Sequence, residues 1–235
     1  MVRRIGKTVA FIPLREKSKS IPFKNIKDMN GRPLVYWVLD AAVHCKEIDM
    51  VVVSTDSKEI KSTVYQYGSE KIKVIGRSEE VSTDSANTES VMLEFASNYD
   101  FDDIILIQAT SPLLTSEDLT KGIKKYRQIT VDSVLSVVRQ RRFIWEKSHH
   151  TMKPVNYNPS NRPRRQEIDG FLVENGAFYI TSRNSLLKTQ SRISGNVDAV
   201  EMREESYYEI DELNDWIIVE NLLRNSIDQK PPAND

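Results

Sequence analysis

An α/β fold with a mainly parallel sheet is predicted by the way apolar runs and helical patterns alternate along the chain. Four short runs rich in Val and Ile suit strands that are buried on both faces, as in parallel sheets. These runs are TVAFIP (8–13), MVVVST (50–55), KIKVIG (71–76) and DIILIQ (103–108). Helical patterns lie between them, and repeated alternation of this kind is typical of a parallel sheet flanked by helices.

Four helices are predicted in the first half of the chain, from apolar periodicity and from signals at their ends. They cover residues 31–45, 56–68, 88–99 and 115–128. Pro33 suits the first turn of the first helix. The second has a capping Asp or Ser at its start and a Gly at its end, and the fourth carries an N-cap signature.

The second half of the chain is less regular. Its predicted elements are strands at 133–138 and 171–181, a helix opening near Ser182 and a last helix at 212–225. Residues 139–170 show no clear periodicity, and a long irregular stretch in a compact domain is usually functional or engaged with a partner. We therefore expect one domain over residues 1–235, with 139–170 as an excursion from it.

The composition excludes several classes of protein. A formal net charge of −1 argues against the basic footprint of a nucleic-acid-binding domain. No apolar run is long enough to span a bilayer, and the apolar start of the chain breaks at Pro13 without a cleavage site for export. The only cysteine is Cys45, which excludes disulfides within the chain and favours a reducing compartment. We expect a cytoplasmic protein that binds neither nucleic acid nor membrane.

A basic turn follows the first predicted strand. The segment FIPLREKSKSIPFKNIK contains Arg15, Lys17, Lys19 and Lys24. Ligands of open α/β sheets bind outside the carboxyl ends of the strands, so these cations would lie where a phosphate group could sit. The segment has neither the GK[ST] of a Walker A motif nor a GxGxxG motif. The alternative is a solvated, flexible loop, because a run of charge is usually only that.

The basic turn and the residues after it resemble the N-terminal signature of the acylneuraminate cytidylyltransferases, the CMP-sialic acid synthetase family. IPLREKSKSIPFKNIKDMNGRPL is similar to Ile-Pro-x-Arg-x-x-Ser-Lys-x-x-Pro-x-Lys-Asn followed by Gly-x-Pro-Leu. The matching residues are Arg15, Ser18, Lys19, Pro22, Lys24, Asn25, Gly31 and Pro33. Many members have two glycines where this chain has Glu16 and Lys17.

Five further segments match the family in the same order. They are VVVSTD, GRSEEVSTDSANTESV, LIQATSPLLTSEDL, RRQEIDGFLVENGAFYI and EIDELNDW. Ser78 and Leu114 depart from the family, which usually has Pro and Arg there. The matches extend from residue 8 to about residue 220. One match alone would be weak, but six in the correct order are specific.

The resemblance implies a Rossmann-like nucleotidyltransferase sheet flanked by helices, with a protruding dimerisation segment. It implies that CTP and a nine-carbon 2-keto sugar acid (sialic acid or a relative) give a CMP-sugar and pyrophosphate. Attack by the sugar's anomeric hydroxyl on the α-phosphorus needs positioning and charge neutralisation more than a protein nucleophile. The resemblance also implies Mg²⁺, with Mn²⁺ as a substitute, and a homodimer in which residues 139–170 reach the partner.

The resemblance assigns roles to individual residues. The catalytic residues are Arg15, Lys19 and Asp211. Nucleotide binding falls to Arg15, Ser18, Lys19, Lys24, Asn25, Arg77, Asp84, Asn87 and Thr88. Sugar binding falls to Gln108, Arg165, Gln166, Asn175, Ala177 and Tyr179. The metal ligands are Asp211 and Glu209.

Structural roles remain open for some of these residues. Asp84 could cap the helix at 88–99, Tyr179 could be a core aromatic, and Asp211 could cap the last helix. Alternation on a strand would point Glu209 and Asp211 to the same side, so that both could reach one ion. Glu209 stands where the family has the shorter Asp, so it could act through a bound water.

The sequence leaves the sugar and two other functions open. QATSP at 108–112 favours the sialic-type branch over the synthetases for the eight-carbon acid, which carry Gln-Gly-Asp-Glu-Pro. An aromatic pair that some members place around the N-acyl group is not evident near Arg192 and Ile193. Legionaminic, pseudaminic and deaminated acids are therefore alternatives. A transferase for another keto-acid sugar, such as an eight-carbon acid, and a catalytically inactive nucleotide-binding module are the other two readings.

Overall fold

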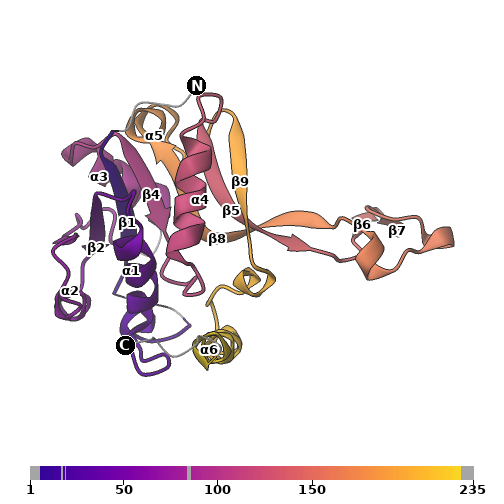
Figure 1. Cartoon of the computed structure of the whole chain (residues 1–235), viewed down its shortest axis with the longest axis horizontal. Helices are drawn as coiled ribbons and strands as arrows, with labels where there is room; N and C mark the ends of the chain where they lie inside the picture. Colours follow the sequence, from indigo (N-terminus) through magenta and orange to yellow (C-terminus); the bar gives the residue numbers. More distant parts are fainter. Residues whose placement is uncertain (1–5, 17, 19, 84–85, 229–235) are drawn as a thin grey trace, which may run out of the picture.

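The central feature of the fold is a twisted sheet with helices on both faces and one long projection (Figure 1). The computed structural model describes residues 6–16, 18, 20–83 and 86–228. Lys19 and Asp84, both predicted to bind the nucleotide, lie outside the described residues. No helix in this part of the chain is long and apolar enough to cross a bilayer.

Seven strands among the described residues form the sheet. They are β1 (Thr8–Leu14), β2 (Met50–Thr55), β3 (Ile72–Ile75), β4 (Asp103–Ile107), β5 (Ser133–Gln140), β8 (Phe171–Ser182) and β9 (Val197–Met202). Their order is β3-β2-β1-β4-β8-β5-β9. All neighbours are parallel except β8, which runs antiparallel to both β4 and β5. The prediction of a mainly parallel α/β sheet is confirmed.

The strand β9 was not predicted because its pattern is that of an edge. Its sequence, VDAVEM, interrupts the apolar residues with Asp198 and Glu201, and both of these carboxylates pair with side chains of neighbouring elements. Asp198 accepts from Lys125 Nζ at 2.9 Å, and Glu201 takes both the Nε and the Nη2 of Arg139 at 2.8 Å. These pairs let a strand with few buried side chains lie along the edge of β5.

Six helices surround the sheet in the described part of the chain. They are α1 (Leu34–His44), α2 (Lys58–Gln66), α3 (Thr88–Asn98), α4 (Ser116–Tyr126), α5 (Arg183–Thr189) and α6 (Leu213–Asp228). Pro33 is the residue before the first turn of α1 rather than part of it. Asn87 caps α3 by accepting from the Ser90 amide, so the capping role considered for Asp84 belongs to Asn87.

Alternation along β1 assigns its side chains to two cores. Ala10, Ile12 and Leu14 pack under α1, α2 and α4, whereas Val9 and Phe11 pack under α3 and α5. Phe11 stacks on Phe95 of α3 with ring centroids 4.8 Å apart. The sheet is therefore buried on both faces, which explains the continuous apolar runs in the sequence.

A third apolar cluster joins the turn after β1 to α6. Its buried members are Ile21, Met29, Leu34, Leu113, Ile210, Trp216, Val219 and Leu223. Ile21 comes from the basic turn and Ile210 from the segment before α6, and both are fully buried. This cluster brings the two segments together at the carboxyl ends of β1 and β4.

The excursion predicted at 139–170 is a projecting arm, but it is more regular than expected (Figure 1). The arm carries the antiparallel hairpin β6 (Trp145–Ser148) and β7 (Thr151–Pro154). His149 adopts a positive φ of 51° in the hairpin turn. Phe143 packs on Tyr157 with ring centroids 4.6 Å apart, and these aromatic contacts give the arm order without a core of its own.

Candidate functional site

An open cleft of about 540 Å³ lies at the carboxyl ends of β1 and β4. Its walls come from the turn after β1, the N-terminus of α3, the residues after β4 and the segment before α6. Ten of the predicted site residues line it: Arg15, Ser18, Lys24, Asn25, Arg77, Asn87, Thr88, Gln108, Glu209 and Asp211. The structure thus brings these ten residues together in one cleft at this edge of the sheet.

The basic turn is folded so that Arg15 and Lys24 line this cleft. Phe23 has a positive φ of 52° and begins a short 3₁₀ turn at Lys24–Ile26. Asn25 closes the turn, because its Nδ2 donates to the Arg15 carbonyl at 3.1 Å. The alternative of a purely solvated loop does not describe these residues, since buried Ile21 anchors the turn in the core.

Lys24 is the link between the basic turn and the segment before α6. Its Nζ donates to the Ile210 carbonyl at 2.7 Å and lies 3.7 Å from Asp211 Oδ1. Burial lowers the pKa of Lys24, and the charge of Asp211 acts in the opposite direction. A phosphate in the cleft would meet an amine that is already desolvated and therefore binds an anion strongly.

Glu209 and Asp211 both line the cleft, although the geometric reason predicted for this was wrong. Residues 209–211 form no strand, so alternation does not orient them. Burial, followed by the charge of Asp211, raises the pKa of Glu209. The Asp211 side chain is 68% exposed. The carboxylate that caps the start of α6 is that of Asp215, whose Oδ2 accepts from the backbone amides of Asp211 and Glu212 at 3.1 and 2.8 Å.

The same two carboxylates fit a divalent cation that also binds phosphates. Mg²⁺ takes oxygen ligands and is usually held by one or two carboxylates plus substrate phosphates. Glu209 and Asp211 supply those oxygens at a cleft with basic residues beside them. A group of three or more His, Cys, Asp or Glu side chains able to hold a metal alone is not found among the described residues.

Gly176 allows Gln108 and Glu209 to approach the floor of the cleft. Gly176 has a φ of +69°, and a Cβ there would lie 2.6 Å from Glu209 Oε2 and 3.1 Å from Gln108 Oε1. The backbone N–H of Gln108 donates to the Ala177 carbonyl at 3.2 Å. A residue without a side chain is therefore needed at this point of β8.

Arg77 holds the ends of two strands at the cleft. Its Nη2 donates to the carbonyls of Leu14, at the end of β1, and Ser54, near the end of β2. Burial lowers the pKa of Arg77, with the charge of Asp56 opposing that effect. The guanidinium thus shapes the wall where the sequence predicted nucleotide contacts.

Three residues predicted to bind the sugar do not line the cleft, because their side chains pack inside the protein. Ala177 is fully buried in the core. The Asn175 side chain is buried and donates to the Ser206 carbonyl at 2.8 Å. Tyr179 is buried too, and its hydroxyl donates to Glu174. Burial and this hydrogen bond raise the pKa of Tyr179, and the reading of Tyr179 as a core aromatic is the better one.

Arg165 and Gln166 also lie away from the cleft of their own chain. Both are exposed in a 3₁₀ turn, Arg165–Glu167. Arg165 Nη2 pairs with Glu204 Oε1 at 3.0 Å. A role in sugar binding within one chain is therefore not supported for either residue.

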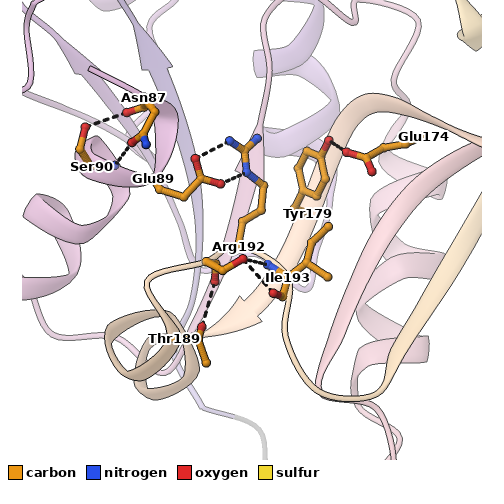
Figure 2. A network of polar contacts seen from close by, with 9 residues as sticks. Asn87, Glu89, Ser90, Glu174, Tyr179, Thr189, Arg192 and Ile193 are labelled. Carbon is orange, nitrogen blue, oxygen red and sulfur yellow. Dashed lines mark hydrogen bonds and ion pairs between the residues drawn. The ribbon is translucent and has the colours of Figure 1, made fainter. Parts of the chain in front are cut away.

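Arg192 is a residue of the cleft that the sequence did not reveal. It lines the cleft and pairs with Glu89 of α3 through two hydrogen bonds of 2.5 and 2.8 Å. Its guanidinium carbon lies 5.0 Å from the centroid of the Tyr179 ring (Figure 2). No periodic pattern marks Arg192, and its partner Glu89 is 103 residues away in the chain.

Comparison with known families identifies the family of this chain. A family model described as cytidylyltransferase matches residues 9–225. The chain belongs to the cytidylyltransferase family. This membership confirms the resemblance predicted from the sequence.

The names of the relatives specify different sugar acids. N-acylneuraminate cytidylyltransferase A of Danio rerio is 39% identical over 216 residues, which are 90% of this chain and 49% of the relative. CMP-N,N'-diacetyllegionaminic acid synthase of Legionella pneumophila is 26% identical over 240 residues, 92% of this chain and 95% of the relative. This chain spans about half the length of the N-acylneuraminate cytidylyltransferases that it matches.

A solved structure supports the nucleotidyltransferase fold. The structure of CMP:2-keto-3-deoxy-manno-octonic acid synthetase complexed with CTP has a TM-score of 0.68 and 17% identity to this chain. The match covers 94% of this chain and 99% of that chain. At 17% identity the similarity shows the fold alone and does not identify the substrate of this chain.

Proposed function

We propose that the protein is a CMP-nonulosonate synthetase. It joins the cytidylyl group of CTP to the anomeric hydroxyl of a nine-carbon 2-keto sugar acid, sialic acid or a relative, and releases pyrophosphate. The observation that carries the proposal is the position of Lys24, which is held against Ile210 and Asp211 in the same cleft as Arg15 and Gln108. Membership of the cytidylyltransferase family supports CTP as the nucleotide.

Different residues of the cleft are assigned to different parts of the two substrates. Arg15 and Lys24 neutralise the phosphates, and Lys19 joins them in the proposal. Asn87 and Thr88 lie at the N-terminus of α3, where free backbone N–H groups favour a negatively charged ligand. Arg77 and Ser18 complete the nucleotide wall. Gln108 faces the sugar and can donate to or accept from a hydroxyl.

Asp211, with Glu209, would hold Mg²⁺ or Mn²⁺ together with the phosphates. A bound divalent cation would neutralise charge at the α-phosphorus and on the pyrophosphate. Lys24 keeps the Asp211 carboxylate beside the phosphate-binding turn and supplies positive charge of its own. No side chain is needed as a nucleophile, because the sugar hydroxyl attacks directly.

A homodimer is part of the proposal, with the arm reaching the partner's cleft. The arm and the strand end beside it expose Trp145 (44%), Phe171 (37%) and Leu172 (49%), and exposed apolar groups of this size mark an interaction surface. In such a dimer Arg165 could leave Glu204 and pair with the carboxylate of the sugar, as a guanidinium fork suits it. A cytoplasmic location belongs to the proposal as well, since buried, free Cys45 suits a reducing compartment.

Release of pyrophosphate tests the function and separates it from its alternatives. The purified protein is incubated with CTP, Mg²⁺ and, in turn, N-acetylneuraminic, legionaminic, pseudaminic and deaminated nine-carbon acids and an eight-carbon acid. Turnover with a nine-carbon acid supports the proposal. Turnover with the eight-carbon acid alone would select the other transferase, and CTP binding without any turnover would select the inactive module.

A further inference from the structure

The start of the basic turn is held by side chains from other parts of the chain. β1 ends at Leu14, and Arg15 and Glu16 follow it outside any helix or strand. Arg77 Nη2 donates to the Leu14 carbonyl at 2.9 Å, and Asn25 Nδ2 donates to the Arg15 carbonyl at 3.1 Å. Both bonds fix the main chain at Arg15, which lines the cleft.

Asp56 supplies a third contact to this part of the turn. Its Oδ1 accepts from the Glu16 backbone N–H at 3.0 Å. The parallel pairing of β1 with β2 brings the two residues together, because Leu14 lies opposite Thr55 and each strand ends there (Figure 1). Three consecutive main-chain groups at the start of the turn are thus each bonded by a side chain from a different segment.

The contact with Glu16 is the structural role that the geometry gives to Asp56. The cap of α2 is Ser57, whose Oγ accepts from the Ile60 backbone N–H at 3.4 Å. Asp56 is exposed, and it does not belong to the described residues that line the cleft. Its carboxylate is therefore placed to act on the cleft through the main chain of the basic turn.

The charge of Asp56 alone would be unfavourable beside a site for phosphates. CTP carries several negative charges, and like charges repel one another. A charged acceptor, however, makes a stronger hydrogen bond to a backbone N–H than a neutral one does. A turn that is already held in its binding conformation also loses less conformational entropy when a ligand binds. The hydrogen bond to Glu16 is thus the benefit that a carboxylate offers here.

We propose that Asp56 is a positioning residue for the nucleotide, which holds the basic turn ready for CTP through the Glu16 backbone N–H. The proposal rests on the proposed function and deepens it, because it assigns the order of the turn to a residue outside the cleft. Without the Asp56 carboxylate, the turn is ordered only when CTP binds. The cost therefore falls on the affinity for CTP and not on the chemical step.

The test compares Asp56→Ala with Asp56→Asn and uses Ser57→Ala as the control. Asp56→Ala removes both the charge and the acceptor, whereas Asp56→Asn removes the charge and keeps an oxygen for the Glu16 N–H. Ser57→Ala removes the neighbouring cap of α2 and leaves the contact with the turn in place. Pyrophosphate release gives kcat and the KM values for CTP and for the sugar acid.

We expect Asp56→Ala to raise the KM for CTP about tenfold, the effect of losing one hydrogen bond to a charged group. This rise is diagnostic, because loss of a negative charge alone would lower the KM for CTP. The kcat and the KM for the sugar acid stay within about twofold of wild type. Asp56→Asn has a KM for CTP at or below the wild-type value, and Ser57→Ala lowers the thermal midpoint without changing either KM.

Three outcomes would overturn the proposal. They are a KM for CTP that falls or stays constant in Asp56→Ala, an equal rise in both Asp56 variants, and an equal rise in Ser57→Ala. Amide hydrogen exchange in the ligand-free protein tests the turn directly. The Glu16 N–H should exchange faster in Asp56→Ala than in wild type and Asp56→Asn, and equal exchange in all three would also contradict the proposal.

Failure of the proposed function looks different from failure of this proposal. The wild-type protein would then release no pyrophosphate with any of the sugar acids, whereas the exchange of the Glu16 N–H would still distinguish the variants. In that case, calorimetric titration with CTP decides the role of Asp56. Binding about tenfold weaker in Asp56→Ala than in wild type supports the positioning role, and equal binding or no binding to either protein overturns it.

Discussion

Nζ of Lys24 lies 3.7 Å from Oδ1 of Asp211, and the same amine donates to the Ile210 carbonyl, 186 residues further along the chain. This contact joins the basic turn after β1 to the segment before α6. It places a cation and a carboxylate at one point of the cleft, where the proposed function needs positive charge for the phosphates and oxygen ligands for a divalent cation.

Asp211→Asn is expected to leave the fold intact and to reduce pyrophosphate release by about a hundredfold, the effect of losing one strong electrostatic contact in a transition state. The fold should survive because Asp215, not Asp211, accepts the amides at the start of α6. The dependence of the remaining rate on low millimolar Mg²⁺ should also weaken. Near-normal turnover with normal Mg²⁺ dependence would leave Asp211 without a metal role.

Asp215→Ala is the matched control for Asp211→Asn. Removing the carboxylate that caps α6 should cost about 1 kcal/mol of stability, measured by chemical denaturation, while the Mg²⁺ dependence stays that of wild type. Glu209→Gln should lie between the two in activity, because the longer side chain can act on the cation through a bound water.

Gly176→Ala tests the floor of the cleft. An alanine there must adopt a left-handed backbone conformation, which costs about 1 kcal/mol or more. Its Cβ would lie only 2.6 Å from Glu209 Oε2, so the Glu209 carboxylate would have to move. We expect a loss of stability together with at least about a tenfold fall in kcat. Gly31→Ala is the control, since Gly31 also has a positive φ of 82° but a Cβ there meets nothing within 4 Å. An equal fall in kcat for both variants would contradict the assigned role of Gly176.

The Glu89–Arg192 pair should make a pH-dependent contribution to stability. The folded pKa of Glu89 is lowered, first by the hydrogen bonds of Arg192. A carboxylate with a depressed pKa stabilises the fold above its unfolded value, and this contribution is lost as the pH falls through the folded value. Denaturation should therefore show Glu89→Gln about 1.5 kcal/mol less stable than wild type near pH 7. The difference should shrink once the pH falls below the ordinary carboxyl value of 4.5, and a constant difference would refute the assignment.

Trp145→Glu tests the arm as a dimer contact. Trp145 is 44% exposed on the arm, and a charge buried against a partner would be strongly unfavourable. Sedimentation at micromolar concentration should give a dimer for wild type and a monomer for the variant, with unchanged circular dichroism. Tyr65→Glu changes a side chain of α2 that is 55% exposed, far from the arm in sequence, and should remain a dimer. A fully active wild-type monomer would falsify the shared site.

The sequence predicted best where burial dictates the pattern. β2 was predicted with its observed bounds, because four of its residues form a fully apolar run between two helical layers. The direction of β8 could not be read, since a strand covered on both faces looks alike whether its neighbours run parallel or antiparallel. The arm hairpin was missed because its strands, WEKS and TMKP, bury no side chain and show no alternation.

The candidate site divides in the same way. Motifs in the basic turn and at 209–211 placed Arg15, Lys24, Glu209 and Asp211 in one cleft, which the structure bears out geometrically. The motif around Asn175 did not reveal which side chains of β8 turn inward, because Gly176 has a positive φ and the pairing of β8 with β5 shifts register between Leu135 and Val137. The position of Arg192 in the cleft depends on its contact with Glu89, which is 103 residues away in the chain. A single sequence gives no sign of such a pair.

The insertion of β8 between β4 and β5 also governs how the chain assembles during synthesis. β4 finds β1 early, but its other edge stays unpaired until residues 171–182 have been made. During that interval the nascent chain presents an apolar strand, Asp103–Ile107, with open hydrogen-bonding groups. Fragments that stop before β8 should therefore self-associate, and the floor of the cleft at Gly176 can form only when nearly the whole chain is present.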